Sequence, residues 1–506
     1  MKSMAAVATV AVATCLVLSA CGGDVSKSGG GSSSGAPGSS GAPSGPGNPT
    51  SPGGGGTTAK AGWSALAPVD GKGPEFLPSV TIDAQGNALA LWMTNGPNNG
   101  PGNEMWASRY VPGTGWATPT RVDTTDGTPN MTGPGTSAPQ LVGSADGHAV
   151  ALWEQFVASV GYGLWARPYD PATGWGTAVQ LAPDETSETY AAGIDAKGNA
   201  IVAWTQRTDV VDTRVFATRY TVGGTWSTPA QIQQPAQTGP GAVTGVSGQD
   251  IYNESVNIAV TSSGNAALTW LQTDTTNTAL WTATFDPANG WTNVNPVVTT
   301  PDPLTKHVFS PDVGMDAKGN LTLVWAELDI ETTGNFAATM SQRYVAGTGW
   351  QTPQAVTTPF TETASLTYPP VVTVNEQGIA AVMWIWPDGT LQASVADATG
   401  KWGATQQISA HPYLLGSRLP QLVVDAAGNA TLAWADTGTS GSNDIFTSRY
   451  SNGAWGTATL FGQNPQDANY PALAVNASGV TALVWQLYKD NTVGNVLQAS
   501  FYTPGT

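Results

Sequence analysis

Polar, charged and aromatic side chains that could bind a ligand recur one to three residues after a repeated tryptophan. Amides and carboxylates hydrogen-bond hydroxyl groups, and an aromatic ring stacks on apolar faces, so this set suits a polar ligand such as a glycan, or a loop of a partner protein. Alternatively, most of these side chains are only solvated strand ends. As a group they are the predicted ligand-binding residues: Glu154, Gln155, Gln206, Arg207, Gln272, Glu327, Trp386, Asp436 and Gln486.

The tryptophan before each of these residues belongs to a unit that the chain repeats eight times. Three residues before the turn glycine of each unit stands Asp, Ser, Thr or Asn, whose side chain can bond backbone amides two residues on. The glycine supplies the positive φ that closes the turn. The unit therefore predicts a β-hairpin, and its strands, apolar on both faces, must be covered on both faces. The turn glycines are Gly86, Gly147, Gly198, Gly264, Gly319, Gly378, Gly428 and Gly479.

Two further strands follow each hairpin. The third carries the sequence of residues 106–110, with close echoes at 216–220 and 446–450. The fourth opens with a second tryptophan that has an apolar residue six positions later, as in Trp116 and Val122. Successive turn glycines are 50 to 66 residues apart, which is near the length of a propeller blade. The sequence thus predicts an all-β fold, an eight-bladed β-propeller of four-stranded antiparallel blades.

The two ends of the repeat array complement each other. The eighth unit stops at Phe501 and Tyr502 without a fourth strand, whereas Trp63 and Val69 form an unpaired fourth-strand pattern near the N-terminus. Because closure removes exposed sheet edges, we expect the N-terminal strand to complete the last blade.

The chain divides into three parts. Residues 1–20 have the basic start and short apolar run of an export signal peptide, too short to be a membrane-spanning helix. Residues 21–61 are rich in Gly, Ser, Pro and Thr and cannot bury enough apolar surface to fold, so they are a predicted disordered tether. Residues 62–506 are the predicted propeller.

The end of the signal resembles the lipobox of bacterial lipoproteins. The residues that carry the resemblance are Leu18, Ser19, Ala20 and Cys21, and it implies that Cys21 is acylated and becomes the first residue of the mature protein. By resemblance to the sorting rule of enteric lipoproteins, Gly22 favours the outer membrane, with the domain either periplasmic or exposed at the cell surface. The repeats themselves resemble bacterial surface repeats of the DAxGNAxAxW type, which imply no particular activity.

The connections between the strands indicate which face of the propeller is functional. The first-to-second turn keeps one length and the third-to-fourth turn nearly so; we call the face that carries them the uniform face. The other connections vary: 38 positions separate Trp226 from Gly264, but 23 separate Trp175 from Gly198. Variable loops on a rigid scaffold usually carry binding residues, so we predict that this variable face, with the polar residues near its inner rim, carries the function.

Two enzyme families share propeller architecture. Sialidase-like enzymes need a cluster of arginines. Here the candidate arginines occupy the same position in different repeats, which indicates a structural role; they are Arg109, Arg219, Arg343 and Arg449. The aspartate box of the sialidase-like family also differs in spacing from the turn repeat of this sequence. Quinoprotein-like propellers have tryptophan-docking segments similar to residues 170–175, but the tryptophan follows the glycine too closely and no cysteine pair is present. We therefore expect no cofactor. The three histidines stand in separate units without zinc spacing, so we also expect no metal site.

Charge limits the partners. The formal net charge is −17, which disfavours nucleic acid and anionic surfaces, so the membrane is contacted through the lipid anchor only. We expect a monomer. The leading hypothesis is a non-enzymatic binding or scaffold module for a glycan or protein partner. The alternative is a glycoside hydrolase or lyase that uses rim carboxylates such as Glu154, Glu327 and Asp436.

Overall fold

In the computed structural model of the protein, residues 58–506 form the compact unit that contains the propeller. The signal peptide, the tether with Cys21 and the long loop 233–255 lie outside the described residues, so the predictions made for them are not addressed by the fold. The structure describes residues 61–69, 75–96, 100–129, 138–159, 161–183, 187–209, 212–232, 256–273, 278–300, 306–331, 334–357, 360–362, 368–386, 388–410, 412, 420–437, 442–461, 467–490 and 494–505.

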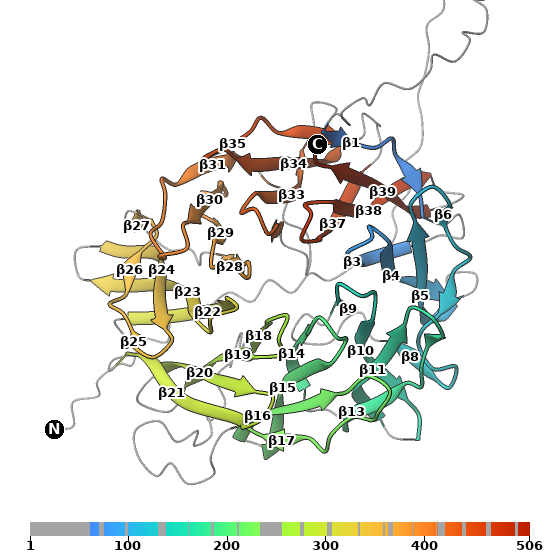
Figure 1. Cartoon of the computed structure of the whole chain (residues 1–506), viewed down its shortest axis with the longest axis horizontal. Coiled ribbons are helices and arrows are strands. Elements are labelled where there is room, and N and C mark those ends of the chain that lie inside the picture. Colours follow the sequence, from blue (N-terminus) through green and yellow to red (C-terminus); the bar gives the residue numbers. More distant parts are fainter. Residues whose placement is uncertain are drawn as a thin grey trace, which may run out of the picture. The chain divides into compact units, whose positions relative to one another are not determined.

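Eight antiparallel sheets stand around a central axis, which confirms the predicted eight-bladed propeller (Figure 1). We number the blades 1 to 8 in the order of their first strands. These first strands lie closest to the axis: β3 (Glu75–Ile82), β9 (Gln140–Gly143), β14 (Ser187–Ile194), β18 (Asn257–Val260), β22 (Lys306–Met315), β28 (Tyr368–Val374), β32 (Gln421–Val424) and β37 (Ala468–Val475).

The second and third strands form the long hairpins of the blades. The second strands are β4 (Ala88–Gly96), β10 (Ala149–Val157), β15 (Ala200–Asp209), β19 (Ala266–Thr273), β23 (Leu321–Glu331), β29 (Ala380–Ile385), β33 (Ala430–Thr437) and β38 (Thr481–Asp490). The third strands are β5 (Gly100–Val111), β11 (Gly161–Asp170), β16 (Asp212–Tyr220), β20 (Thr278–Asp286), β24 (Gly334–Val345), β30 (Leu391–Ala396), β34 (Asn443–Ser451) and β39 (Gly494–Thr503).

The fourth strands are the outermost and are mostly short or broken. In blade order they are β6 (Gly115–Trp116) with β7 (Thr120–Arg121), β12 (Gly174–Trp175) with β13 (Val179–Pro183), β17 (Ala230–Gln231), β21 (Gly290–Thr300), β25 (Gly349–Trp350) with β26 (Gln354–Ala355) and β27 (Phe360–Glu362), β31 (Gln406–Ser409), and β35 (Ala454–Trp455) with β36 (Thr459–Phe461). A further strand, β8 (Gly127–Pro129), pairs with β10 in blade 2.

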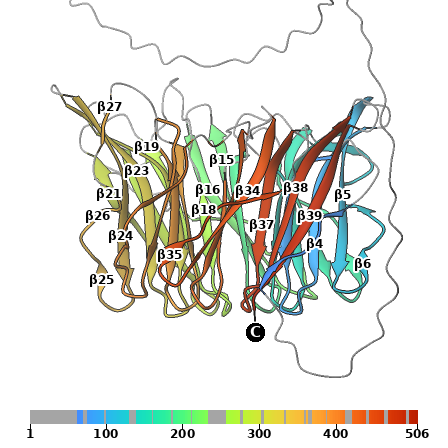
Figure 2. The same ribbon diagram turned by 90° about the horizontal axis from the view of Figure 1, so that it is seen from above.

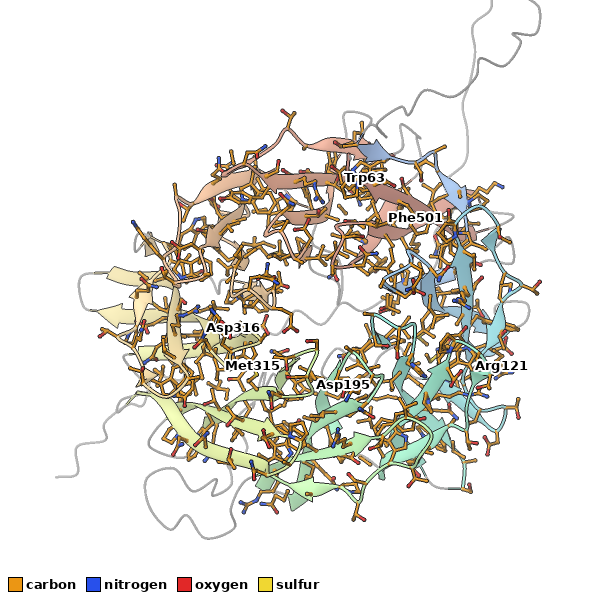
Figure 3. All side chains as sticks on the ribbon, viewed as in Figure 1. Trp63, Arg121, Asp195, Met315, Asp316 and Phe501 are labelled. Carbon is orange, nitrogen blue, oxygen red and sulfur yellow. The ribbon has the colours of Figure 1, made fainter. Side chains whose placement is uncertain are left out.

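Blade 8 takes its fourth strand from the N-terminal end of the propeller, as predicted. Strands β1 (Gly62–Trp63) and β2 (Ala67–Pro68) both pair with β39. Trp63 lies opposite Tyr502 and contacts Phe461 of blade 7 edge to face, with ring centroids 5.0 Å apart. The Trp63 ring also contacts Tyr502, with centroids 5.6 Å apart, so backbone pairing and aromatic packing both join β1 to β39; Figure 3 labels Trp63 and Phe501 at this part of the ring.

The core is divided among the boundaries between neighbouring blades. The eight second-strand tryptophans are fully buried, with exposed fractions of 0 or 1%; Trp92, for example, packs with Leu497 and Ala499 of blade 8. Replacing such a side chain by alanine typically costs about 3–5 kcal/mol. The second strands are therefore covered on both faces, as their apolar sequence predicts.

The repeated turns have the predicted geometry. All eight turn glycines have positive φ, between 81° and 93°. In blade 1 the Asp83 Oδ1 accepts hydrogen bonds from the amides of Gln85 and Asn87, at 2.9 and 2.8 Å. These turns lie at the same end of the blades as the mark C in Figure 2 and form the uniform face, and the second-to-third hairpins lie at the opposite, variable face.

Candidate functional site

The predicted ligand-binding residues lie on the second strands or directly after them, at the variable-face ends. The second strands are one strand removed from the axis, because the first strands are innermost. The predicted residues therefore do not line the central opening directly. They belong to seven different blades, and only Glu154 with Gln155, and Gln206 with Arg207, share a strand.

Four of these residues accept a hydrogen bond from the buried tryptophan two positions earlier. The indole Nε1–H groups donate over 2.8 Å to Gln155, 3.2 Å to Gln206, 3.4 Å to Glu327 and 3.3 Å to Asp436. Gln155 also donates to Thr124 and is fully buried. A buried indole left without an acceptor costs free energy, so these side chains stabilise the blades. A combined replacement of Gln206, Glu327 and Asp436 is therefore expected to lower the melting temperature, not only to affect binding.

The remaining predicted residues are placed differently. Gln272 and Gln486 are buried, with 4% and 8% exposure. Glu154 is half-buried. The Trp386 ring is half-buried and meets Trp384 edge to face, with ring centroids 6.3 Å apart. The side chain of Arg207 is outside the described part of the chain. Buried amides such as Gln272 are hardly accessible to a ligand, so they are weaker candidates than the half-buried Glu154 and Trp386.

Exposed aromatic residues on the variable face were missed by the sequence reading. Phe156 and Tyr162 face each other across the β10–β11 hairpin, with ring centroids 4.9 Å apart, and are 42% and 45% exposed. Tyr488, near the end of β38, is 37% exposed. Phe156 and Tyr488 both stand three residues after the second-strand tryptophan. The sequence did contain a signal for them. A residue three positions after the tryptophan points to the opposite side of the strand from the tryptophan, and in only these two units is it aromatic.

Two carboxyl groups lie opposite each other in blade 7. Asp436 on β33 lies directly opposite Asp444 on β34. Asp436 accepts hydrogen bonds from Trp434 and from Ser409 of blade 6. Asp444 is only 5% exposed, and burial raises its pKa. A carboxyl whose pKa is raised by burial, lying beside a second carboxyl, is the kind of pair that acid and base catalysis uses.

A charged cluster on blade 1 is satisfied internally. Arg121, on the outer side of the ring in Figure 3, forms two hydrogen bonds to Asp123, at 3.0 and 2.8 Å, and one to Glu104 at 2.8 Å. Burial raises the pKa of Asp123 although Arg121 and the amide of Met105 hydrogen-bond to it. With its donors and acceptors paired in this way, the cluster stabilises the end of the blade and offers little to a ligand.

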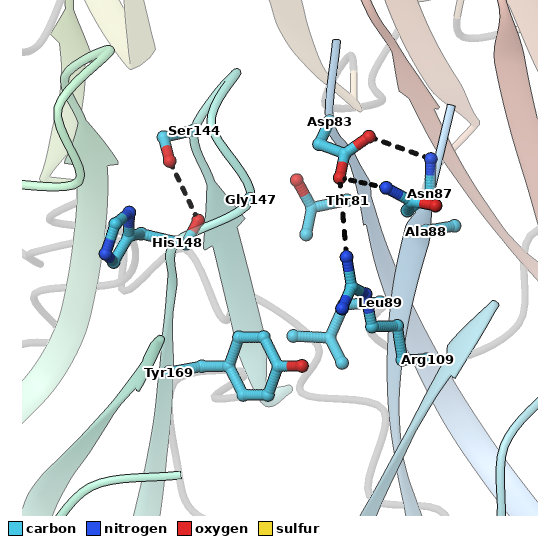
Figure 4. A pocket seen from close by; sticks show the side chains of 10 residues that line it. All are labelled: Thr81, Asp83, Asn87, Ala88, Leu89, Arg109, Ser144, Gly147, His148 and Tyr169. Carbon is cyan, nitrogen blue, oxygen red and sulfur yellow. Dashed lines mark hydrogen bonds and ion pairs between the residues drawn. The ribbon is translucent and has the colours of Figure 1, made fainter. Parts of the chain in front are cut away.

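A small cavity on the uniform face lies between blades 1 and 2 (Figure 4). Its volume of about 10 Å³ suits at most one water molecule. Ser144 and His148 line it, but the Ser144 hydroxyl donates to Asp146, and His148 Nδ1 lies 2.9 Å from the same carboxylate. Since the serine is bonded to the acid and not to the base, it is not an activated nucleophile.

Within the described ranges, no group of three or more His, Cys, Asp and Glu side chains could hold a metal ion. In the same part of the chain, no helix has the length and apolar character needed to cross a membrane.

No protein-family model and no curated protein matches the chain. Among solved structures, the BP39L lectin from Burkholderia pseudomallei is 12% identical, with a TM-score of 0.47, over 78% of this chain and 100% of the lectin. Puromycin hydrolase is 14% identical, with a TM-score of 0.43, over 85% of this chain and 62% of the hydrolase. The polysaccharide lyase Uly1 is 9% identical, with a TM-score of 0.42, over 78% of this chain and 93% of the lyase. At these identities the likeness concerns the propeller fold and carries no argument for a particular activity.

Proposed function

We propose that this protein is a non-enzymatic binding or scaffold module, held at the outer membrane by a lipid on Cys21, that engages a glycan or protein partner through its variable face. The observation that carries the proposal is the exposed pair of Phe156 and Tyr162. Exposed aromatic side chains in mutual contact offer a large apolar area at low entropic cost and are typical of binding sites.

The pair is held on a rigid support. Strands β10 and β11 pair without interruption from Ala149 opposite Tyr169 to Val157 opposite Gly161. Strand β8 pairs with the other edge of β10, so that Thr128 lies opposite Phe156. A ligand that stacks on the two rings would therefore find them already positioned, with the half-buried Glu154 on the same strand as a polar neighbour.

The proposal is tested by photo-crosslinking in living cells from a probe at Tyr162, with a matched probe at Leu460, which is 39% exposed on the outermost strand of blade 7. We expect a discrete adduct from Tyr162 alone, and its loss in Phe156→Ala. For a glycan partner, purified protein should bind glycans and the Phe156→Ala/Tyr162→Ala variant should not. If neither adduct nor Tyr162-dependent glycan binding is found, the assignment of the variable face is wrong. The lipid anchor is tested separately, since Cys21→Ser should move the protein from the membrane fraction to the soluble fraction.

A second candidate function is glycoside hydrolysis or lysis at Asp436 and Asp444. Directly opposed residues of an antiparallel pair place their Cβ atoms about 4.5–5.5 Å apart, which is close to the carboxyl separation of about 5 Å in retaining glycosidases. Release of reducing ends from a polysaccharide, lost in Asp444→Asn, would support it. The binding function is preferred because Asp444 is only 5% exposed.

A further inference from the structure

We propose that the groove where the ring closes, between blades 8 and 1 on the uniform face, is a second binding site, which takes a neutral carbohydrate. The groove has a volume of about 780 Å³, within the usual range for small-molecule sites. It goes beyond the proposed function because it lies on the opposite face from Phe156 and Tyr162. Its lining residues are Ala61, Gly62, Trp63, Ser64, Gln85, Gly86, Tyr110, Pro112, Val480, Phe501 and Thr503.

The groove arises from the way in which the ring closes. In blade 1 a tight turn joins the third strand to the fourth, with the Thr114 amide bonded to the Val111 carbonyl at 3.0 Å. In blade 8 the third strand ends at Thr503 and the fourth strand begins at Gly62, which comes from the other end of the propeller. Among the described residues, no turn joins these two strand ends, and the groove lies between this corner of blade 8 and the neighbouring turn of blade 1.

A comparison with the boundary between blades 6 and 7 shows a second cause. There Ile379 fills the space beside the turn glycine of the next blade: a Cβ on Gly428 would lie 2.4 Å from the Ile379 Cδ1. The equivalent residue in blade 8 is the smaller Val480. The contact nearest to a Cβ on Gly86 is Pro112 of its own blade at 3.7 Å, and Val480 is not among the neighbours. Isoleucine at this position therefore closes the boundary between blades 6 and 7, whereas valine leaves the boundary between blades 8 and 1 open.

The lining combines aromatic rings with uncharged polar groups. The rings of Tyr110 and Phe501 stack with their centroids 4.1 Å apart. Gln85 and Thr503 are exposed and supply an amide and a hydroxyl. All the lining residues are described by the structure, and none is charged. In a protein with a net charge of −17, such a lining favours a neutral ligand that has both an apolar face and hydroxyl groups, which describes a neutral sugar.

The test is isothermal titration of the mature chain with neutral mono- and disaccharides, using galacturonic acid as a charged comparison. We expect saturable binding of at least one neutral sugar and none of the acid. Gln85→Ala should weaken that binding about tenfold, a loss of about 1.4 kcal/mol, whereas Lys318→Ala, at the equivalent exposed turn position of blade 5, should leave it unchanged.

A blocking variant gives an independent readout. Val480→Trp should fill the groove and abolish sugar binding, while the same side chain introduced by Asn265→Trp at the equivalent turn of blade 4 should not. The Phe156→Ala/Tyr162→Ala variant should retain sugar binding at the groove, so the two sites can fail separately. Sugar binding that survives both Gln85→Ala and Val480→Trp, or no binding of any neutral sugar, would overturn the proposal.

Discussion

Odd-numbered and even-numbered blades join their successors with different side chains. The turn of blades 1, 3, 5 and 7 opens with an aspartate, whereas blades 2, 4, 6 and 8 have serine, threonine or asparagine there. In each odd blade the aspartate also accepts a hydrogen bond from the asparagine side chain four residues later, at 2.7 to 2.9 Å. The odd residues are Asp83, Asp195, Asp316 and Asp425, and the even ones are Ser144, Thr261, Asn375 and Asn476.

The arginines that share one repeat position on the third strand follow the same alternation; they are Arg109, Arg219, Arg343 and Arg449. This position is arginine only in odd blades, and each of the four side chains reaches forward to the next even blade. Arg109 and Arg343 donate to the carbonyls of Pro171 and Ala398, at 3.4 and 2.9 Å. Arg449 lies over the Tyr502 ring, 4.3 Å from its centroid. These arginines are therefore structural, as their repeat slot predicts.

Even blades reach forward with hydrogen-bond donors. The side-chain amides of Asn375 and Asn476 donate to the carbonyls of Asp425 and Asp83, at 2.9 and 3.0 Å. A second contact is made by the residue four positions before the Asp, Ser, Thr or Asn that opens each turn. In blade 4 this residue is Asn257, whose side chain donates to the carbonyl of Pro311 in blade 5 at 2.8 Å. In blade 5 it is Asp312, which accepts a hydrogen bond from the Val372 amide of blade 6 at 2.8 Å. On the uniform face the ring is therefore built as four two-blade units and not as eight equal blades.

The largest test of this difference compares Asp316→Ala with Asn375→Ala. Asp316 is 2% exposed and lies 3.7 Å from the buried guanidinium of Arg343. Its removal leaves that charge unpaired, and we expect the free energy of unfolding to fall by about 3–5 kcal/mol. Asn375 is neutral, so its removal should cost about 1–3 kcal/mol. The measurement is denaturant unfolding followed by circular dichroism.

Adding Arg343→Met to Asp316→Ala should recover part of the loss, because the unpaired charge is removed. Equal losses for Asp316→Ala and Asn375→Ala would show that the alternation has no energetic weight.

A second test uses pH. Burial raises the pKa of Asp312 to about 6, against an ordinary value of 3.8, although the amides of Val372 and Val313 hydrogen-bond to it. The folded state therefore binds a proton that the unfolded state has released, and stability falls as pH rises between these two values. The cost at pH 7 is about 3 kcal/mol.

The matched variant is Asp312→Ser, which copies Ser79 at the same position of blade 1; Ser79 accepts the Leu141 amide of blade 2 at 3.2 Å. We expect the melting temperature of Asp312→Ser, relative to the natural protein, to rise steadily from pH 4 to pH 7. A difference that is constant over this range would mean that the pKa of Asp312 is the same in the folded and the unfolded state.

The repeat architecture was readable from the sequence because it depends on local rules. Turn glycines at a fixed distance from a buried tryptophan predicted the hairpins, and the incomplete eighth unit with the orphan pattern at Trp63 predicted ring closure. The alternation was also present in the sequence, in the residues three positions before each turn glycine. The contacts that it makes could not be predicted, because the side chain of Asn375 bonds the carbonyl of Asp425, which is 50 residues away in the sequence.

The candidate site was harder to predict. Gln206 and Glu327 have the residue types of a binding site, but whether such a group faces solvent or an indole depends on the tilt of the strand end and on the loop above it. The pair of Phe156 and Tyr162 requires the register of β10 with β11, which no local pattern fixes. The groove between blades 8 and 1 depends on how the two ends of the ring meet, where Gly62 pairs with Thr503, and on the smaller side chain of Val480 compared with Ile379.

The smallest test asks where the alternation ends. On the variable-face half of the second strands, indole acceptors occur in blades 2, 3, 5 and 7, which is not an odd–even pattern. The Trp92 indole of blade 1 is buried without a hydrogen-bond partner among the described residues. Thr94→Gln would place an acceptor where Gln206 serves Trp204, and we expect a gain of up to about 1 kcal/mol. Gln206→Leu should lose a similar amount. If thermal unfolding shows both effects, the side chains that accept from the indoles are interchangeable between blades on the variable-face half, and the two-blade unit is confined to the uniform face. No gain from Thr94→Gln would mean that blade 1 differs for a reason beyond its missing acceptor.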